Sequence, residues 1–373
     1  MVTTDTSHRI SGLPAIAVPP AMLEAIAAGA WIVFNLSGGK DSSAAMFTVN
    51  PLLDALGHPR ERRLALHADL GRAEWDETPA TVEDLSALAG LPLTIVRRAA
   101  GDLFDRWAKR FANGKARYEA LETYNLIGPW SSSALRFCTS EMKAHVIGPH
   151  LARTLRGATI VNVLGLRRDE SPARAHTPEW KPDPRYAPAG NPHGTRMMLW
   201  NPLTHWTTPQ VLAAHATLHI PLHIAYTCHG SSRLSCRFCV LQSLADARAS
   251  ASAPANRDAL LHLVDLEASS TFSFQPGRWL ADTDPRLLPD DLARRIGTAK
   301  ADAAERRRLE TAMPPELRYV RGWPPRMPTH DEAAIITASR APILARHDLS
   351  NLYPTANAVR ARFADLIDVR RAA

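Results

Sequence analysis

The chain has 373 residues, which is enough for two domains of ordinary size. Hydrophobic residues make up 45% and charged residues 22%, and no apolar run is long enough to cross a membrane. The first ten residues lack the basic and apolar parts of a secretory signal, so we expect a cytoplasmic protein. The net charge of +7 and a pI near 9.5 favour anionic partners such as nucleotides or nucleic acid.

Apolar strands alternate with helices along the first 240 residues. Strands are predicted at 31–36, 63–70, 93–98 and 158–166. Helices are predicted at 21–30, 42–49, 76–91, 101–114, 139–155 and 209–220, with interruptions at Pro51 and near Gly148-Pro149. Residues 172–201 are predicted to be a loop, because they hold many Pro residues and show no period. This alternation predicts an α/β fold with a doubly wound, mostly parallel sheet.

The character of the sequence changes beyond residue 240. The remainder has few strand signals, many Pro residues and a charged helical stretch at 299–312. We therefore expect a nucleotide-binding domain over 1–243 and a mainly helical C-terminal region of unknown role over 244–373.

The sequence SGGKDSS at residues 37–43, here called the phosphate loop, follows the first predicted strand directly and opens a helix. Glycines let the backbone approach an anion closely, and the N–H groups at a helix start favour phosphate. Lys40 adds a cation, while Asp41 is expected to position a metal or to cap the helix. The loop is not a Walker A motif, because Asp41 follows Lys40.

The phosphate loop resembles the PP-loop of the ATP pyrophosphatase superfamily, whose members cleave ATP between the α- and β-phosphates. Four further segments resemble the phosphoadenosine phosphosulfate (PAPS) reductase-like family. These are 67–78, which includes Asp69 and Gly71, then 136–143, 165–174, and 201–220. The resemblance covers about residues 31–243 and implies an adenine nucleotide alpha-hydrolase-like fold.

This resemblance implies a set of site residues. Catalysis would use Lys40, Asp41, Lys143 and Arg167. The nucleotide would contact Ser37, Gly38, Gly39, Lys40, Asp41, Ser42, Ser43, Asp69, Gly71, Arg136, Gly165, Arg168, Glu170, Ser171 and Arg174. Asp69 at a strand end suits Mg²⁺ or a ribose hydroxyl, and arginines suit phosphate. The alternatives are solvated surface charges for the arginines and a salt bridge for Glu170. Trp75 and Trp206 are expected to be core anchors or neighbours of the adenine.

Four cysteines are present, and Cys228, Cys236 and Cys239 lie within the twelve residues 228–239, here called the cysteine segment. Metal binding or redox chemistry is more typical of such cysteines in a cytosolic chain than structural disulfides. Cys138 together with this triplet resembles the pattern of iron–sulfur DNA phosphorothioation enzymes. That resemblance implies a [4Fe–4S] cluster on all four cysteines; a Zn²⁺ site and free or disulfide-forming thiols are the alternatives.

The expected function is an enzyme that binds ATP and Mg²⁺, adenylates an acceptor and releases pyrophosphate, after which sulfur displaces AMP. DNA or tRNA is the expected acceptor, held in part by arginines at 167–174 and 306–308. A cysteine desulfurase and other complex subunits are the further expected partners. No association with a membrane is expected. One alternative is a sulfonucleotide (PAPS/APS) reductase, against which stands the lack of a cysteine after Cys239. The other is a non-catalytic nucleotide-binding module of a modification or defence complex.

Overall fold

The computed structural model describes residues 12–320 and 322–372, which form two compact units. Unit 1 holds the residues up to Leu103 together with Arg136–Asn256, and unit 2 holds Phe104–Leu135 together with the residues from Arg257 onward. We use these units in place of the ranges 1–243 and 244–373. The N-terminal stretch on which the signal-peptide prediction depends lies outside the described residues. No helix in the described ranges is both long and apolar enough to span a membrane.

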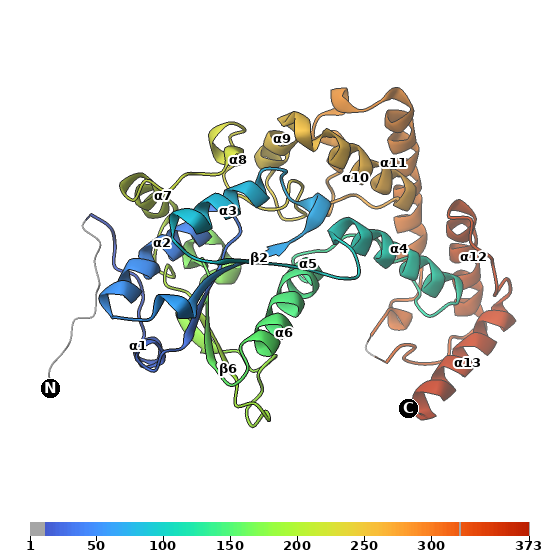
Figure 1. Ribbon diagram of the computed structural model, residues 1–373. Helices are drawn as coiled ribbons and strands as arrows, with labels where there is room; N and C mark the ends of the chain where they lie inside the picture. The colour runs from blue at the N-terminus through green and yellow to red at the C-terminus, as the bar shows by residue number, and fades with distance from the viewer. Residues whose placement is uncertain (1–11, 321, 373) are drawn as a thin grey trace. The chain divides into compact units, whose positions relative to one another are not determined.

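Unit 1 is built on a sheet, of which Figure 1 labels β2 and β6. The sheet has six strands in the order β3-β2-β1-β4-β6-β5. The strands are β1 Trp31–Asn35, β2 Arg63–Asp69, β3 Leu93–Arg97, β4 Thr159–Val163, β5 Trp180–Pro182 and β6 Arg196–Trp200. All neighbouring strands pair in parallel except β5, which pairs antiparallel with β6 at one edge. The mostly parallel sheet predicted from the alternation of elements is confirmed.

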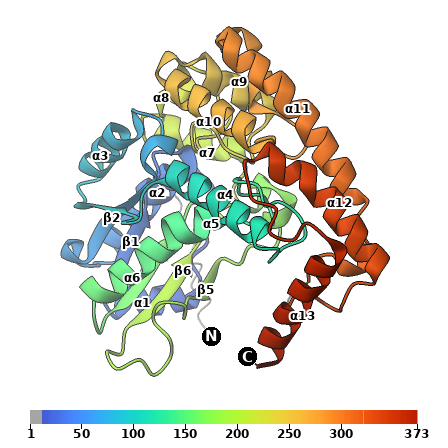
Figure 2. The same ribbon diagram turned by 90° about the vertical axis from the view of Figure 1, so that its right-hand side faces the viewer.

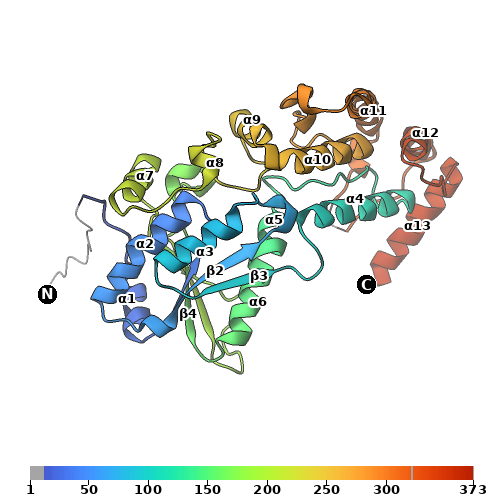
Figure 3. The same cartoon turned by 45° about the horizontal axis from the view of Figure 1, so that its top comes forward.

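Helices pack on both faces of this sheet (Figure 3). On one face, Ile32 and Phe34 of β1 join a core with α1 (Pro20–Ala27), α2 (Lys40–Ala55), α3 (Thr78–Leu88) and α7 (Thr208–Thr217). On the other face, Val33 packs in a core that includes α6 (His145–Thr154). Because alternate residues of a strand point to opposite faces, the apolar run of β1 is buried on both sides.

Three local predictions were wrong. The segment 172–201 contains β5 and β6, and β6 pairs on both sides although the segment is rich in proline. Helix α2 continues through Pro51 to Ala55 instead of stopping there. The helix predicted at 139–155 consists of a short α5 (Phe137–Thr139), a π-helical turn (Ser140–Ala144) and α6, which contains Pro149 without a break.

Unit 2 is helical, as predicted for the C-terminal region (Figure 2). Its helices are α4 (Leu103–Glu119), α10 (Arg257–Ser270), α11 (Asp290–Thr311), α12 (His330–Arg346) and α13 (Ala356–Ala372), whereas α9 (Leu244–Ser252) belongs to unit 1. The predicted polyanion surface at 306–308 fits poorly here. Arg306 is buried, donates to the Thr271 carbonyl at 3.1 Å, and stacks 3.6 Å from the ring centroid of Phe272.

Candidate functional site

The phosphate loop and the 165–174 segment meet at the carboxyl ends of two adjacent strands. β1 leads into the loop, β4 leads into Gly165, and the strand order runs in opposite directions from this pair. In open α/β sheets, ligands bind at such a switch point. The approach is close, because a Cβ atom on Gly165 would lie 2.5 Å from the carbonyl carbon of Asp41 and 2.6 Å from the nitrogen of Ser42.

Hydrogen bonds within the phosphate loop set its shape. Gly38 has a φ of +71°, which favours glycine, and Gly39 is the N-cap of α2. The Ser42 and Ser43 hydroxyls donate to the Gly39 carbonyl at 2.9 and 3.0 Å, and the Ser37 N–H donates to the Ser42 hydroxyl at 3.2 Å. The loop therefore presents the positive end of a 16-residue helix at the edge of the sheet.

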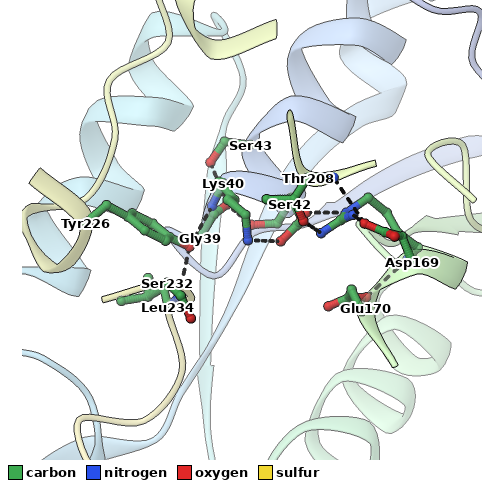
Figure 4. Close-up of polar contacts among 12 residues, drawn as sticks. Gly39, Lys40, Ser42, Ser43, Asp169, Glu170, Thr208, Tyr226, Ser232 and Leu234 are labelled. Atoms are coloured by element: carbon green, nitrogen blue, oxygen red, sulfur yellow. Dashed lines mark hydrogen bonds and ion pairs between the residues drawn. The ribbon is translucent and has the colours of Figure 1, made fainter. Parts of the chain in front are cut away.

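A chain of alternating charges crosses the start of α2 (Figure 4). The Lys40 Nζ lies 3.0 Å from one oxygen of Asp41, and the Arg167 Nε donates to the other at 2.6 Å. Arg167 also donates to Asp169 at 3.2 Å and to the Thr208 hydroxyl at 3.1 Å, and its side chain is 2% exposed. Because every nitrogen of this guanidinium has a protein acceptor, contact of Arg167 with a ligand would require an exchange of its present partners.

Asp69 and Gly71 form the turn that follows β2. One oxygen of Asp69 accepts the Gly71 N–H at 2.6 Å, and the other accepts the Arg97 Nε at 2.9 Å. Gly71 has a φ of +62°. Contact of Asp69 with a ribose hydroxyl or Mg²⁺ therefore requires an exchange of its present partners.

The other predicted binding residues lie near the ends of α5 and β4. Arg136 is exposed at the start of α5. Arg168 donates to a backbone carbonyl at 3.0 Å, and Arg174 forms a salt bridge with Glu170, with Ser171 between them in the same turn. In this structure Glu170 therefore has the salt-bridge role that was the alternative to nucleotide contact.

The four cysteines form no disulfide, and Cys228 is exposed while the other three are half-buried. Burial raises the pKa of the Cys236 thiol, as do the nearby Cys239 and Cys138, so these three lie in one neighbourhood. No group of three or more His, Cys, Asp or Glu side chains in the described ranges is placed to hold a metal ion. The implied four-cysteine cluster does not fit this arrangement unless the segment rearranges, and we derive no chemical step from it.

Lys143 lies near both Cys236 and His67. The positive charge of Lys143 lowers the pKa of both Cys236 and His67. His67 is buried, and its ring nitrogens lie 3.0 Å from the Leu36 carbonyl and 3.0 Å from a Glu74 oxygen. Burial lowers the pKa of His67, but Glu74 and the Leu36 carbonyl together raise it by more, so the net shift is upward. The ring thus ties the residue before the phosphate loop to Glu74.

Two hydrogen bonds made by Tyr226 were not predicted from the sequence. Tyr226 on α8 (Ile224–Thr227) accepts the backbone N–H of Lys40 at 3.2 Å and that of Leu234 at 2.8 Å. No motif marks this tyrosine, because its partner Lys40 is distant in sequence.

Trp75 and Trp206 are 3% and 1% exposed and pack in the core, which was one of their two predicted roles.

Comparison with known proteins identifies the family. The model of the phosphoadenosine phosphosulfate reductase domain matches residues 31–241, which is more than half of the chain. Among solved structures, the phosphate complex of PAPS reductase from Candida auris is 13% identical with a TM-score of 0.33, covering 57% of this chain and 93% of that one. No curated protein matches the chain. The family predicted from the PP-loop resemblance is confirmed, and the chain belongs to the phosphoadenosine phosphosulfate reductase domain family.

Proposed function

We propose that the chain binds ATP with its Mg²⁺ at the phosphate loop and transfers the adenylyl group to an acceptor oxygen, releasing pyrophosphate. The observation that carries this proposal is the loop itself. A glycine turn delivers the first turn of α2 to the switch point of the sheet, with the 6%-exposed side chain of Lys40 beside it. Such a site holds negative charge through helix N–H groups and one cation, which suits a phosphate chain.

The reaction requires charge neutralisation and positioning more than a protein nucleophile. The acceptor oxygen attacks the α-phosphorus, the bond from that phosphorus to the bridging oxygen breaks, and pyrophosphate leaves with the bonding electron pair. Lys40 and the N–H groups of α2 stabilise the charge that develops on the leaving pyrophosphate. Asp41 holds Lys40 in place, and Arg167 holds Asp41. In a second step, a sulfur nucleophile displaces AMP from the activated acceptor.

Magnesium enters this scheme as part of the nucleotide substrate. Carboxylate oxygens are the preferred protein ligands of Mg²⁺. Asp41 belongs to the phosphate loop, and Asp69 lies at the end of β2. Each carboxylate already accepts from a cation, Arg167 or Arg97. Mg²⁺ on either carboxylate would therefore replace a protein partner, and its charge would be shared with the phosphates.

The deciding experiment measures two products from the same purified chain. ATP should support exchange of labelled pyrophosphate when the acceptor is present, whereas PAPS with thioredoxin should release no sulfite. Sulfite release without pyrophosphate exchange would favour the sulfonucleotide reductase, the alternative that the family match supports. Tight nucleotide binding with neither product would favour a non-catalytic module.

An iron–sulfur cluster on the four cysteines, formed after the cysteine segment rearranges and serving as a structural clasp, is the second part of the proposal. It is supported by the shared neighbourhood of Cys138, Cys236 and Cys239. Anaerobic purification should give about four iron atoms and matching sulfide per chain, and Cys→Ser at any of the four cysteines should lower the iron content. Stoichiometric zinc without sulfide would reject the cluster. A cysteine desulfurase is the proposed sulfur donor, with a thiol reductant as co-reactant, because persulfide sulfur must gain two electrons to become the sulfide that displaces AMP. Transfer of labelled sulfur from cysteine in the presence of that thiol tests the donor.

Nucleic acid is the proposed acceptor, supported by the net charge of +7. Because each neutralised phosphate releases counterions, binding to duplex DNA should weaken with salt at a log–log slope of about −0.9 per contact. Fluorescence anisotropy with labelled DNA and tRNA across a salt series measures this slope. Binding that does not depend on salt, or no binding to either nucleic acid, would redirect the proposal to a small-molecule acceptor.

A further inference from the structure

The hydroxyl of Tyr226 joins two segments that are distant in the sequence. It accepts the backbone N–H of Lys40 at 3.2 Å and the backbone N–H of Leu234 at 2.8 Å (Figure 4). Lys40 is the first residue of α2, and Leu234 stands two residues before Cys236. One oxygen atom therefore links the phosphate loop to the cysteine segment.

Side-chain packing reinforces this link. A Cβ atom on Gly38 would lie 3.5 Å from Leu234 Cδ2, and one on Gly39 would lie 3.5 Å from Leu234 Cβ and 3.6 Å from the Tyr226 hydroxyl. The Lys40 Nζ lies 5.7 Å from the centroid of the Tyr226 ring. The two glycines of the phosphate loop thus lie directly under Leu234 and Tyr226, so that movement of either segment disturbs the other.

The chemistry of the phenol suits a permanent link. A neutral phenol has two lone pairs, which is the number needed for two N–H donors. The cysteine segment is also attached elsewhere, since the Arg237 N–H donates to the Ala73 carbonyl at 2.8 Å and the Ser232 N–H to Asp246 at 2.8 Å. Among these attachments of the cysteine segment, the one through the Tyr226 hydroxyl connects it to Lys40 in the phosphate loop.

We propose that Tyr226 is a positioning residue that couples anion binding at the phosphate loop to the reactivity of the Cys236 and Cys239 thiols. This inference rests on the proposed function, because the anion is the phosphate chain of the nucleotide. An anion that engages Lys40 and the first turn of α2 fixes the loop. Through Tyr226 and Leu234 it then holds the cysteine segment in its half-buried conformation. Coupling between two sites is reciprocal, so a change at the thiols alters the affinity for the anion.

The test uses inorganic pyrophosphate as the probe and the reduced full-length chain. Calorimetry measures binding of pyrophosphate and of ATP, and mass spectrometry follows alkylation of Cys236 and Cys239 by iodoacetamide. Saturating pyrophosphate should slow alkylation about five-fold, the lower end of typical coupling between sites. Tyr226→Phe keeps the ring but loses the acceptor, and should bind pyrophosphate without slowing alkylation.

Tyr186→Phe is the matched control, because the hydroxyl of Tyr186 is buried in unit 1 and has no hydrogen-bond partner among the described residues. This variant should retain the five-fold protection. Equal protection in wild type and Tyr226→Phe would overturn the role of Tyr226, and pyrophosphate binding without protection in wild type would overturn the coupling itself. Absence of binding by both pyrophosphate and ATP would overturn the proposed function as well.

A measurement on the wild-type chain covers the case in which Tyr226→Phe does not fold. Hydrogen exchange of the Lys40 and Leu234 amides should slow together when pyrophosphate binds, because both amides donate to the same oxygen. Slowing of the Lys40 amide alone would overturn the coupling, since the cysteine segment would then be indifferent to the anion.

Discussion

The phosphate loop and the cysteine segment are neighbours in unit 1, but they are built in different ways. In the loop, backbone geometry brings the groups together, because a strand, a glycine turn and a helix start fix where Lys40 and Asp41 stand. In the cysteine segment, the Ser232 N–H donates to Asp246 and the Arg237 N–H donates to the Ala73 carbonyl, and these bonds fix the backbone. The thiols form no group able to hold a metal within the described ranges. An anion site thus follows from secondary structure, whereas a metal site needs side chains to converge.

The largest effect should come from the charges at the start of α2. Lys40→Ala or Asp41→Ala should lower pyrophosphate release by about 10² to 10³, since Lys40 supplies charge stabilisation worth roughly 3–4 kcal/mol and Asp41 holds Lys40 in place. Circular dichroism should show an intact fold in both variants. Lys181→Ala is the control, because this exposed lysine lies on the edge strand β5. Wild-type turnover in a folded Lys40→Ala/Asp41→Ala double variant would remove the assignment of the loop.

The second prediction compares the buried Arg167 with the partly exposed Arg174. Arg167→Met leaves Asp41 without its 2.6 Å partner, and breaking a buried ion pair should cost about 3 kcal/mol of stability. Arg174→Met breaks a pair whose side chains are both about a quarter exposed, and should cost no more than about 1 kcal/mol. Hydrogen exchange of the β1 and β4 amides measures both changes. Equal costs would show that Arg167 does not hold the loop.

The third prediction tests the close approach of β4 to the loop. A methyl group at Gly165 meets the backbone of Asp41 at 2.5 Å, which cannot move aside without shifting α2. Gly165→Ala should therefore cost about 1–3 kcal/mol and weaken nucleotide binding. Gly297→Ala in α11 should act in the opposite direction, because nothing lies within 4 Å of its added carbon and alanine favours a helix. A neutral Gly165→Ala would mean that the two segments are not in contact in solution.

Local pattern was enough to predict β1, β2 and the phosphate loop, because each combines an apolar run with a distinct boundary. It was not enough for β6, whose five residues lie in a Pro-rich segment and gain their place only by pairing with β4 and β5. Arg167 and Tyr226 show the same limit. The residue type of Arg167 suggested a ligand contact, but its guanidinium is bonded to Asp41 and Thr208, which are distant in sequence. Tyr226 carries no motif, and its contacts with Lys40 and Leu234 appear only in the folded chain.

The smallest expected effect is a difference in the free energy of unfolding between a thiol variant, Cys236→Ser, and a variant of the carboxylate that holds the cysteine segment, Asp246→Ala. Asp246 accepts the Ser232 N–H at 2.8 Å and the Ser243 hydroxyl at 2.7 Å, so Asp246→Ala should cost about 2 kcal/mol in a chelator-treated chain. Cys236→Ser should cost less than about 1 kcal/mol there. Burial raises the pKa of Asp246, but the hydrogen bonds to its carboxylate lower this pKa by more. The carboxylate therefore stabilises the fold above the ordinary pKa of 3.8, and this stabilisation is lost as the pH falls through the lowered pKa. Hydrogen exchange over residues 231–239 measures both variants. A larger cost for Cys236→Ser than for Asp246→Ala would mean that the thiols, and not the carboxylate, hold the segment in place.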